Sequence, residues 1–342
     1  MKKLVLLCLM ALGTQAQTFT NPLLPSGADP WSVYHEGNYY YMHTTGNSLQ
    51  LRTTKSITDL KSAAPKTIWK PPVSGPYSKD IWAPEIHFLE GKWYVYFTGN
   101  DGKSGDNRRI YVLENSSPNP MEGEWTMKGK MSDESDQWAI DGSVFEYQGK
   151  LYMIWSGWDH ASKTDETQNI YIAALKNPWT VESKRVLIST PELPWERYWD
   201  NTTAGKPGRP VYVNEGPQFL KHGNKVFIVY SASGCWTNTY ALGLLTAKNG
   251  ANLLDPKSWK KNDKPVFEQS QSNKVYGTGH NSFFKSPNGK EDWLLYHANS
   301  GPDEGCGGKR APRAQKIKWK TDGTPDFGKP LPDGVAIKEP SK

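Results

Sequence analysis

The sequence of 342 residues contains only three cysteines, and it has no apolar run of the length that a membrane-spanning helix needs. So few cysteines exclude a disulfide-based scaffold and a zinc ribbon built from cysteines. Basic residues number 41 against 35 acidic ones without any block of five like charges, so we expect no nucleic-acid partner and no membrane insertion. The signatures of serine-elbow hydrolases, zinc proteases and nucleotide-binding loops are also absent.

Residues 1–16 have the three-part pattern of an export signal. Two lysines precede an apolar stretch from Leu4 to Leu12 that is too short to span a bilayer, and a small-x-small cleavage site ends at Ala16. Cys8 leaves a lipoprotein signal as the alternative, but a leucine precedes it where a small residue is expected. We therefore expect residues 17–342 to form one domain, exported to the periplasm or the extracellular space.

Short runs of aromatic and β-branched residues recur along the chain, and each follows a polar turn that contains glycine and an earlier apolar run. The five runs are residues 39–42, 93–97, 151–155, 226–230 and 293–296. A hairpin that recurs in one register predicts an all-β fold, a five-bladed β-propeller with four-stranded antiparallel blades around a central channel. Two β-sandwiches would also contain many short strands, but they would not explain the repeated register.

Acidic residues stand at one place in this repeat, eight residues before the turn glycine, at Asp29, Asp141 and Glu215. The same count reaches Ala83 in the second unit, and the fifth unit begins this strand near His280. Because the first strand of each blade lines the channel, we expect the three acids to meet in one pocket. Each acid alone could be explained as a residue that favours a turn. Clustered carboxylates repel one another, however, so three of them in one pocket indicate a functional role.

Two tasks suit such a cluster: hydrolysis of a glycosidic bond by an acid and a base, and binding of a hard cation. No loop rich in aspartate and asparagine accompanies the three acids, so we favour hydrolysis. Indole rings stack on sugars, and Trp31, Trp82 and Trp158 fall on the same predicted face. Most of the 15 tryptophans are nevertheless expected to pack between strands.

Two of the cysteines, Cys235 and Cys306, fall in loops on this face in neighbouring units. They could pair in an oxidising compartment, but loop position alone does not give the distance between their Cα atoms. The sequence therefore leaves both the bonded and the free state open.

Motifs at the start of the predicted blades resemble those of glycoside hydrolase family 43. They are, in chain order, Gly27-Ala28-Asp29-Pro30-Trp31, Trp82-Ala83-Pro84-Glu85-Ile86-His87, Ala139-Ile140-Asp141-Gly142, Asn214-Glu215-Gly216-Pro217 and Gly279-His280-Asn281-Ser282. That family consists of five-bladed propellers that cleave arabinose- or xylose-containing glycans with inversion. The likeness extends from about Asn21 to Gly328, and the segments 75–78 and 235–237 make the chain similar to the exo-acting α-L-arabinofuranosidases of the family.

This resemblance implies a role for each acid: Asp29 as the general base, Glu215 as the general acid, and Asp141 as the residue that orients the acid and adjusts its pKa. It also implies that His280 faces a metal ion or water at the channel centre and that Arg313 contacts the terminal sugar. No cofactor is expected for the chemistry, and a structural calcium ion in the channel is left open.

The resemblance further implies a monomeric, inverting enzyme that releases terminal α-L-arabinofuranose from arabinan or arabinose-decorated plant polysaccharides and oligosaccharides. In an inverting enzyme the base and acid carboxyls stand about 6.5–9.5 Å apart and leave room for a water molecule. The alternatives are a β-xylosidase or an endo-arabinanase of the same fold, a non-catalytic glycan-binding propeller, and a propeller that calcium stabilises.

Overall fold

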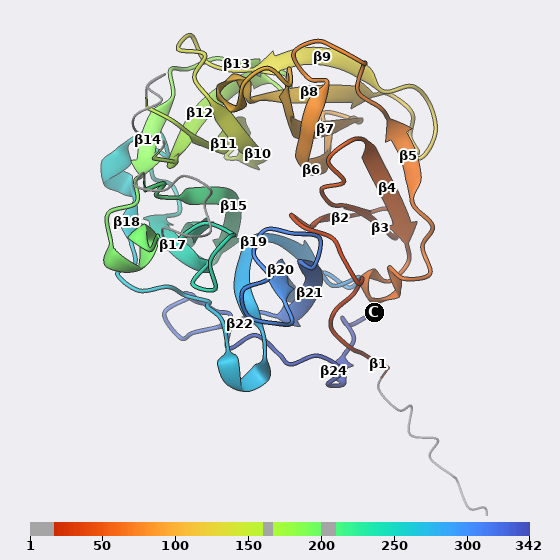
Figure 1. Ribbon diagram of the computed structural model, residues 1–342, viewed down its shortest axis with the longest axis vertical. Helices are drawn as coiled ribbons and strands as arrows, with labels where there is room; N and C mark the ends of the chain where they lie inside the picture. The colour runs from red at the N-terminus through yellow and green to blue at the C-terminus, as the bar shows by residue number, and fades with distance from the viewer. Residues whose placement is uncertain (1–16, 160–166, 200–209) are drawn as a thin grey trace, which may run out of the picture.

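The computed structural model describes residues 17–159, 167–199 and 210–342, and the predicted export signal lies outside these residues. Antiparallel sheets stand around a ring and are visited in chain order (Figure 1). The fold is therefore a five-bladed β-propeller, which confirms the fold class predicted from the repeat. None of the helices in the described part of the chain is long and apolar enough to cross a membrane.

Each blade is an antiparallel sheet whose first strand faces the channel. Blade 1 consists of β2 (Trp31–His35), β3 (Asn38–Met42), β4 (Leu49–Thr54) and β5 (Lys66–Trp69), and blade 2 of β6 (Lys79–Leu89), β7 (Lys92–Asn100), β8 (Arg109–Asn115) and β9 (Thr126–Met131). Blade 3 consists of β10 (Ala139–Tyr147), β11 (Lys150–Gly157), β12 (Asn169–Asn177), β13 (Thr180–Val181) and β14 (Val186–Ser189). Blade 4 consists of β15 (Asn214–His222), β16 (Lys225–Ala232), β17 (Ala241–Lys248) and β18 (Lys260–Lys261), and blade 5 of β19 (Tyr276–Lys285), β20 (Asp292–Asn299) and β21 (Ala311–Lys316).

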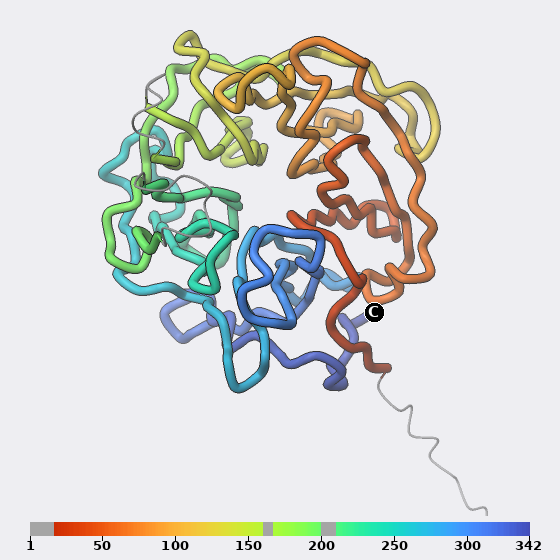
Figure 2. Tube along the Cα trace, viewed as in Figure 1, coloured from red at the N-terminus to blue at the C-terminus, as the bar shows by residue number. Residues whose placement is uncertain are grey.

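The N-terminal segment closes the ring against blade 5. The strand β1 (Thr18–Phe19) pairs with β24 (Ile337–Lys338) near the C-terminus, and Figure 2 shows these two ends of the chain side by side. The Asn21 side chain then exchanges two hydrogen bonds with the backbone of Ala314, and Leu23 N–H donates to the carbonyl of Pro312 at 2.8 Å. The outer edge of β21 is thereby covered, so that the last blade does not present an open strand edge.

The hydrophobic core is divided among the contacts between neighbouring blades, because both faces of each blade are covered. Successive residues of a strand point to opposite faces. In β3, for example, Tyr39 and Tyr41 pack in the cluster against blade 5, whereas Tyr40 and Met42 pack in the cluster against blade 2. This arrangement explains why the second strands are continuous apolar runs without polar alternation.

A left-handed backbone residue stands at the head of each first strand. These residues are Asp29 (φ 56°), Ala83 (φ 43°), Asp141 (φ 56°), Gly216 (φ 54°) and His280 (φ 45°). In blade 4 the glycine takes the place that an acid takes in blades 1 and 3. Counting back eight residues from the turn glycine is therefore wrong by one in blade 4, because glycine is the first residue of that turn and the second in blades 1 to 3. Glu215 lies one residue before the shared left-handed position.

Hydrogen bonds from these residues tie each blade to the one before it. The backbone N–H groups of Ala83, Asp141 and His280 donate to hydroxyls of the preceding blade, Thr44 at 2.7 Å, Thr98 at 3.2 Å and Ser231 at 2.7 Å. Asp29 N–H donates to Nδ1 of His297 in blade 5 at 3.0 Å, which continues the pattern across the closure of the ring. Between blades 3 and 4, Gly216 N–H donates instead to the carboxylate of Asp141 at 3.1 Å.

We predict that Thr98→Val, which keeps the shape of the side chain but removes its acceptor, lowers the free energy of unfolding by about 1–3 kcal/mol. The reason is that the N–H of Asp141 would lose its partner in the interior. Urea unfolding measures the loss, and Thr126→Val at an exposed position of β9 is the matched control. Equal effects of the two substitutions would contradict the role given to this hydrogen bond.

Candidate active site

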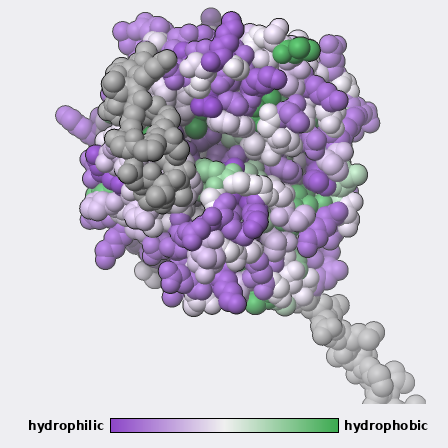
Figure 3. Space-filling model, in the orientation of Figure 1, coloured by the Kyte–Doolittle hydropathy of each residue, from purple (hydrophilic) through white to green (hydrophobic). Residues whose placement is uncertain are grey.

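A cavity of about 400 Å³ opens at the end of the ring where the first strands begin. Its lining includes Asp29, Asp141 and Glu215, which come from blades 1, 3 and 4. Figure 3 shows the surface hollowed near the centre of the ring, where hydrophilic and hydrophobic residues meet. Acids that are more than seventy residues apart in the sequence thus share one cavity, and each of the three is more than nine-tenths buried.

Asp29 is surrounded by groups that favour its ionised form. Thr44 Oγ1 donates to Oδ2 at 2.5 Å, Arg310 Nη1 lies 3.2 Å from Oδ1, and His280 Nδ1 lies 3.3 Å from Oδ1. Burial by itself would raise the pKa of Asp29. The facing His280 and Arg310 side chains outweigh this effect and hold the pKa well below its ordinary value. Asp29 is therefore a carboxylate at any pH near neutrality.

Asp141 and Glu215 have the opposite character. Burial, as the largest cause, raises the pKa of each, and the pKa of Asp141 is raised further by the charge of Glu215. Gly216 N–H donates to Asp141 at 3.1 Å and the Tyr240 hydroxyl donates to Glu215 Oε1 at 2.8 Å, so neither carboxyl lacks a partner. The two groups titrate as a pair, and burial makes this pair retain a proton at a higher pH than exposed carboxyls do.

Two glycines make room for this arrangement. A Cβ atom on Gly279 would lie 2.0 Å from the ring of Tyr240, so only glycine lets the tyrosine reach Glu215. A Cβ atom on Gly216 would lie 3.3 Å from the imidazole of His280, at a backbone φ of 54° that favours glycine. The glycines of the fourth and fifth motifs thus place side chains at the cavity although they carry none.

The pKa values of the two histidines of blade 5, His280 and His297, are shifted in opposite directions. Burial by itself would lower the pKa of His280, but the surrounding carboxyl groups, Asp29 first, raise it above its ordinary value. Burial, together with the positive charge of Arg310, keeps the pKa of His297 well below its ordinary value. Because His297 Nδ1 accepts the N–H of Asp29, His297 is neutral with its proton on Nε2.

The walls of the cavity are held by stacked side chains and a disulfide bond. The guanidinium of Arg108 lies 4.4 Å from the ring centre of Trp82, and Asp80 pairs with the same arginine at 2.9 Å. Across the cavity wall from blade 4 to blade 5, Cys235 is bonded to Cys306 with 5.2 Å between their Cα atoms. The bonded state left open by the sequence is therefore the one observed, and it joins the loop of Trp236 to the loop of Arg310.

A sequence model described as glycosyl hydrolases family 43 matches residues 19–325 of the chain. The chain belongs to glycosyl hydrolase family 43.

Relatives within the family are similar over nearly the whole chain. An extracellular exo-α-(1→5)-L-arabinofuranosidase of Streptomyces avermitilis is 39% identical over 97% of this chain and 69% of its own length. The α-L-arabinofuranosidase 43 of Humicola insolens is 37% identical over 95% of this chain and 66% of its own length, so the chain spans about two thirds of these longer relatives. The crystal structure of an α-L-arabinofuranosidase from Lactobacillus brevis superposes with a TM-score of 0.83 at 38% identity and covers 93% of this chain and 98% of its own.

Some of the residues predicted to contact sugar lie away from the cavity of this family 43 protein. Trp31 packs between blades 1 and 2, where its Nε1 donates to the carbonyl of Ile86 at 2.7 Å. Trp158 stacks behind Trp138 with ring centres 4.7 Å apart, so Trp138 and not Trp158 lines the cavity. Trp82 and His280 do line it, and their contacts with substrate stay predictions.

Arg313 is also displaced from its predicted place. It is fully buried inside β21, where it pairs with Asp333 and donates to Ser300 Oγ at 2.9 Å. Arg310, three residues earlier in the loop, takes the position at the cavity beside Asp29. The boundary between loop and strand could have distinguished the two arginines in the sequence. An arginine in the loop before the strand can reach the channel, whereas an arginine inside the strand packs within the blade.

The donors near the channel axis do not fit a calcium ion held by the protein. Among the described residues no group of three or more His, Cys, Asp and Glu side chains is placed to hold one metal ion. Asp29, the carboxylate beside His280, is already engaged by Arg310 and Thr44. The calcium ion and the metal role of His280 stay predictions from the resemblance, and no step described below passes through a metal.

We predict that Asp141→Asn makes the protein more stable than the parent, and by at least about 1 kcal/mol more at pH 8 than at pH 5. The pKa of Asp141 is raised on folding, so its contribution to stability is present at low pH and is lost as the pH rises through the folded-state pKa. Asparagine has no such loss and still accepts the N–H of Gly216. Denaturant unfolding at both pH values checks this, with Asp59→Asn at an exposed site as control; a gain independent of pH would contradict it.

Proposed function

We propose that this chain is an inverting, exo-acting α-L-arabinofuranosidase that releases terminal α-L-arabinofuranose from arabinan or arabinose-decorated plant polysaccharides. The observation that carries the proposal is the division of charge in one cavity: an ionised carboxylate held by Arg310, opposite a buried carboxyl pair with raised pKa values. Similar proteins of the family are named as α-L-arabinofuranosidases, which supports this choice of sugar.

Asp29 is the general base in this proposal. Its lowered pKa keeps it ionised, so it can accept a proton from a water molecule as the oxygen of that water attacks the anomeric carbon. A carboxylate with a low pKa is a weak base toward ordinary water. The attacking water becomes far more acidic in the transition state, and its proton moves to Asp29 only at that stage. The Thr44 and Arg310 contacts also fix the direction in which the free lone pairs of the carboxylate point.

Glu215 is the general acid, and Asp141 is the residue that orients it and adjusts its pKa. Glu215 gives its proton to the glycosidic oxygen as the bond from that oxygen to the anomeric carbon breaks. Water therefore ends as the new hydroxyl on the opposite face of the sugar, with one of its protons on Asp29, and no covalent intermediate forms. The raised pKa, for which burial is the first cause, favours the protonated form that a general acid needs.

The cavity favours the end of a glycan over its middle. Its walls include the loops that the Cys235–Cys306 bond joins and the Trp82–Arg108 stack. A volume of about 400 Å³ is in the lower part of the range for small-ligand pockets, which suits a terminal sugar and part of the next one.

We also propose that the protein acts outside the cytoplasm. The export pattern of residues 1–16 supports this, and so does the word extracellular in the names of similar arabinofuranosidases from Streptomyces avermitilis and Streptomyces chartreusis. A disulfide bond at the active cavity is compatible with an oxidising compartment. The monomeric state and the absence of a nucleic-acid partner stay predictions from the sequence.

The test of the reaction compares the parent with Asp29→Asn and Glu215→Gln on 4-nitrophenyl α-L-arabinofuranoside, 4-nitrophenyl β-D-xyloside and linear arabinan. We expect the parent to release arabinose from the first and third substrates. Asp29→Asn should lose about 10²–10⁴-fold in kcat on both, because no group would activate water. Glu215→Gln should be as severe on arabinan but milder on the aryl substrate, whose leaving group needs little protonation.

Chromatography of the released sugars and NMR of the anomer formed first are the measurements. Turnover of the xyloside alone would move the proposal to a β-xylosidase, and long oligosaccharides from arabinan would move it to an endo mode. Retention of configuration would remove Asp29 from the role of base, and equal losses of Glu215→Gln on aryl substrate and arabinan would remove Glu215 from the role of acid.

We predict that Tyr240→Phe shifts the alkaline limb of the pH profile of kcat/KM on arabinan upward by about one unit. The Tyr240 hydroxyl lowers the pKa of Glu215 by donating to its ionised form, so its removal raises the pH at which the acid loses its proton. Tyr296→Phe, which removes a buried hydroxyl bonded to Gln315 away from the cavity, is the matched control. An unchanged alkaline limb in Tyr240→Phe would show that this hydrogen bond does not tune the acid.

A further inference from the structure

A second groove runs along the rim of blade 4, outside the active cavity. It consists of a smaller cavity of about 150 Å³ and a larger one of about 320 Å³. Both are lined by Pro265, Glu268 and Gln269, so the segment that connects β18 to β19 forms their common wall. We call the two together the rim groove.

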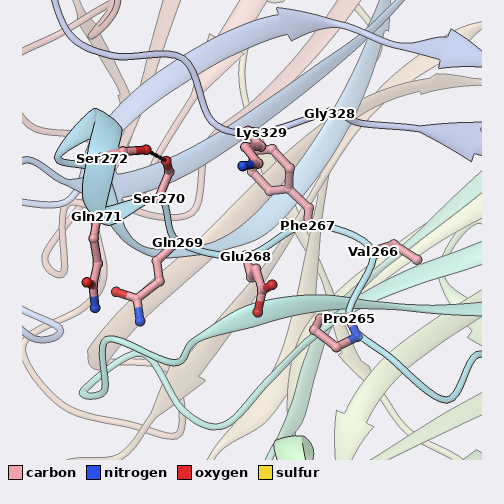
Figure 4. Close-up of a pocket in the computed structure, with 10 residues that line it drawn as sticks. All are labelled: Pro265, Val266, Phe267, Glu268, Gln269, Ser270, Gln271, Ser272, Gly328 and Lys329. Carbon is pink, nitrogen blue, oxygen red and sulfur yellow. Dashed lines mark hydrogen bonds between the residues drawn. The ribbon is translucent and has the colours of Figure 1, made fainter.

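The backbone of this wall is fixed to blade 4. Val266 N–H donates to the carbonyl of Leu242, and Leu242 N–H donates to the carbonyl of Phe267, both at 2.8 Å. The Phe267 side chain is almost fully buried and anchors the segment in the core between blades 4 and 5. Figure 4 shows the consequence: the side chains of Glu268 and Gln269 point to one side, away from the ring of Phe267.

Aromatic side chains line the smaller cavity of the rim groove. Trp195 lies in the 3-10 helix η3 (Pro194–Arg197), and its Nε1 donates to the carbonyl of Asp263 at 3.1 Å. Tyr198 follows directly after that helix and is 46% exposed; no other aromatic side chain in the described residues is as open to solvent. An exposed ring beside a second, fixed ring is a surface on which the C–H face of a sugar can stack.

The polar groups of the rim groove are suited to hydroxyls and carry little net charge. Gln269 lines both cavities of the groove, and its side-chain amide carries both a donor and an acceptor that suit hydroxyl groups. Gln271 extends beside it on the same side (Figure 4). Among the lining side chains Glu268 and Lys329 carry one charge of each sign, which does not favour a polyanion.

A single loop separates the rim groove from the active cavity. Thr239 lines the smaller cavity of the groove, whereas Cys235 and Trp236 of the same loop line the active cavity. The loop is held in place by the bond from Cys235 to Cys306 and by the Thr237 hydroxyl, which donates to the carbonyl of Ser233 at 3.0 Å. A polysaccharide with one end in the active cavity can therefore pass over this loop and lie in the groove.

We propose that the rim groove is a second binding site for a neutral, arabinose-containing polysaccharide. The proposal rests on the proposed function for its choice of ligand. A chain held in the groove stays near the active cavity after each terminal sugar leaves, because binding at one site raises the effective concentration of chain ends at the other. The groove thus acts on polymers and not on small substrates.

The experiment uses Tyr198→Ala and Gln269→Ala, together and singly, with Leu187→Ala as a control at an exposed apolar residue of blade 3. We expect kcat/KM on linear arabinan to fall at least about five-fold in the double variant through KM, with kcat/KM on 4-nitrophenyl α-L-arabinofuranoside unchanged. Equal losses on both substrates, or no loss on the polymer, would overturn the proposal.

Affinity electrophoresis through gels that contain linear arabinan supplies a readout that does not need turnover. The Asp29→Asn protein should be retarded by arabinan, and adding the two groove substitutions to it should abolish most of the retardation. Retardation by polygalacturonate but not by arabinan would overturn the assignment of a neutral ligand. If the parent does not cleave the aryl arabinofuranoside but the groove substitutions still abolish retardation, the proposed function is wrong. The proposal that the rim groove binds arabinan would then still be supported.

Discussion

The hydrogen bonds that join the head of each blade to the preceding blade are the constraint on which the rest of the structure depends. They require a left-handed backbone residue at the start of each first strand, which turns its N–H toward the neighbouring blade and its side chain toward the axis. The same feature that closes the ring therefore places Asp29, Asp141 and His280 around one cavity. The blade 3–4 contact is the exception, and there a catalytic candidate, Asp141, serves as the acceptor.

Carboxyl groups that are equally buried have pKa values shifted in opposite directions because of what faces them. Asp29 has a guanidinium, an imidazole and a hydroxyl within 3.3 Å, and these overcome the cost of burying its charge. Asp141 and Glu215 receive one neutral donor each, which is not enough, so burial raises their pKa values. One cavity thus holds an ionised carboxylate together with two carboxyl groups of raised pKa, and the charges of all three raise the pKa of His280.

The loops at the head of blades 4 and 5 give the cavity its shape and connect it to the rest of the surface. The disulfide bond joins them, Trp236 and Arg310 project from them into the cavity, and the outer side of the blade 4 loop lines the rim groove. Loops of this kind carry specificity in propellers because the blades beneath them are rigid and fully packed.

The sequence by itself determined the number of blades, the hairpins and the three acids, because these depend on local patterns: strand runs, turn glycines and short motifs with fixed spacing. It failed where the answer depends on a neighbour. The count back from the turn glycine misses by one residue in blade 4 because that turn begins with its glycine. Arg313 and Trp158 pack inside blades, while Arg310 and Trp138 line the cavity. Only the tertiary structure decided the charge of each acid, the partner of Glu215 and the state of the cysteines, since burial and distance between remote segments are properties of the closed ring and not of any stretch of chain.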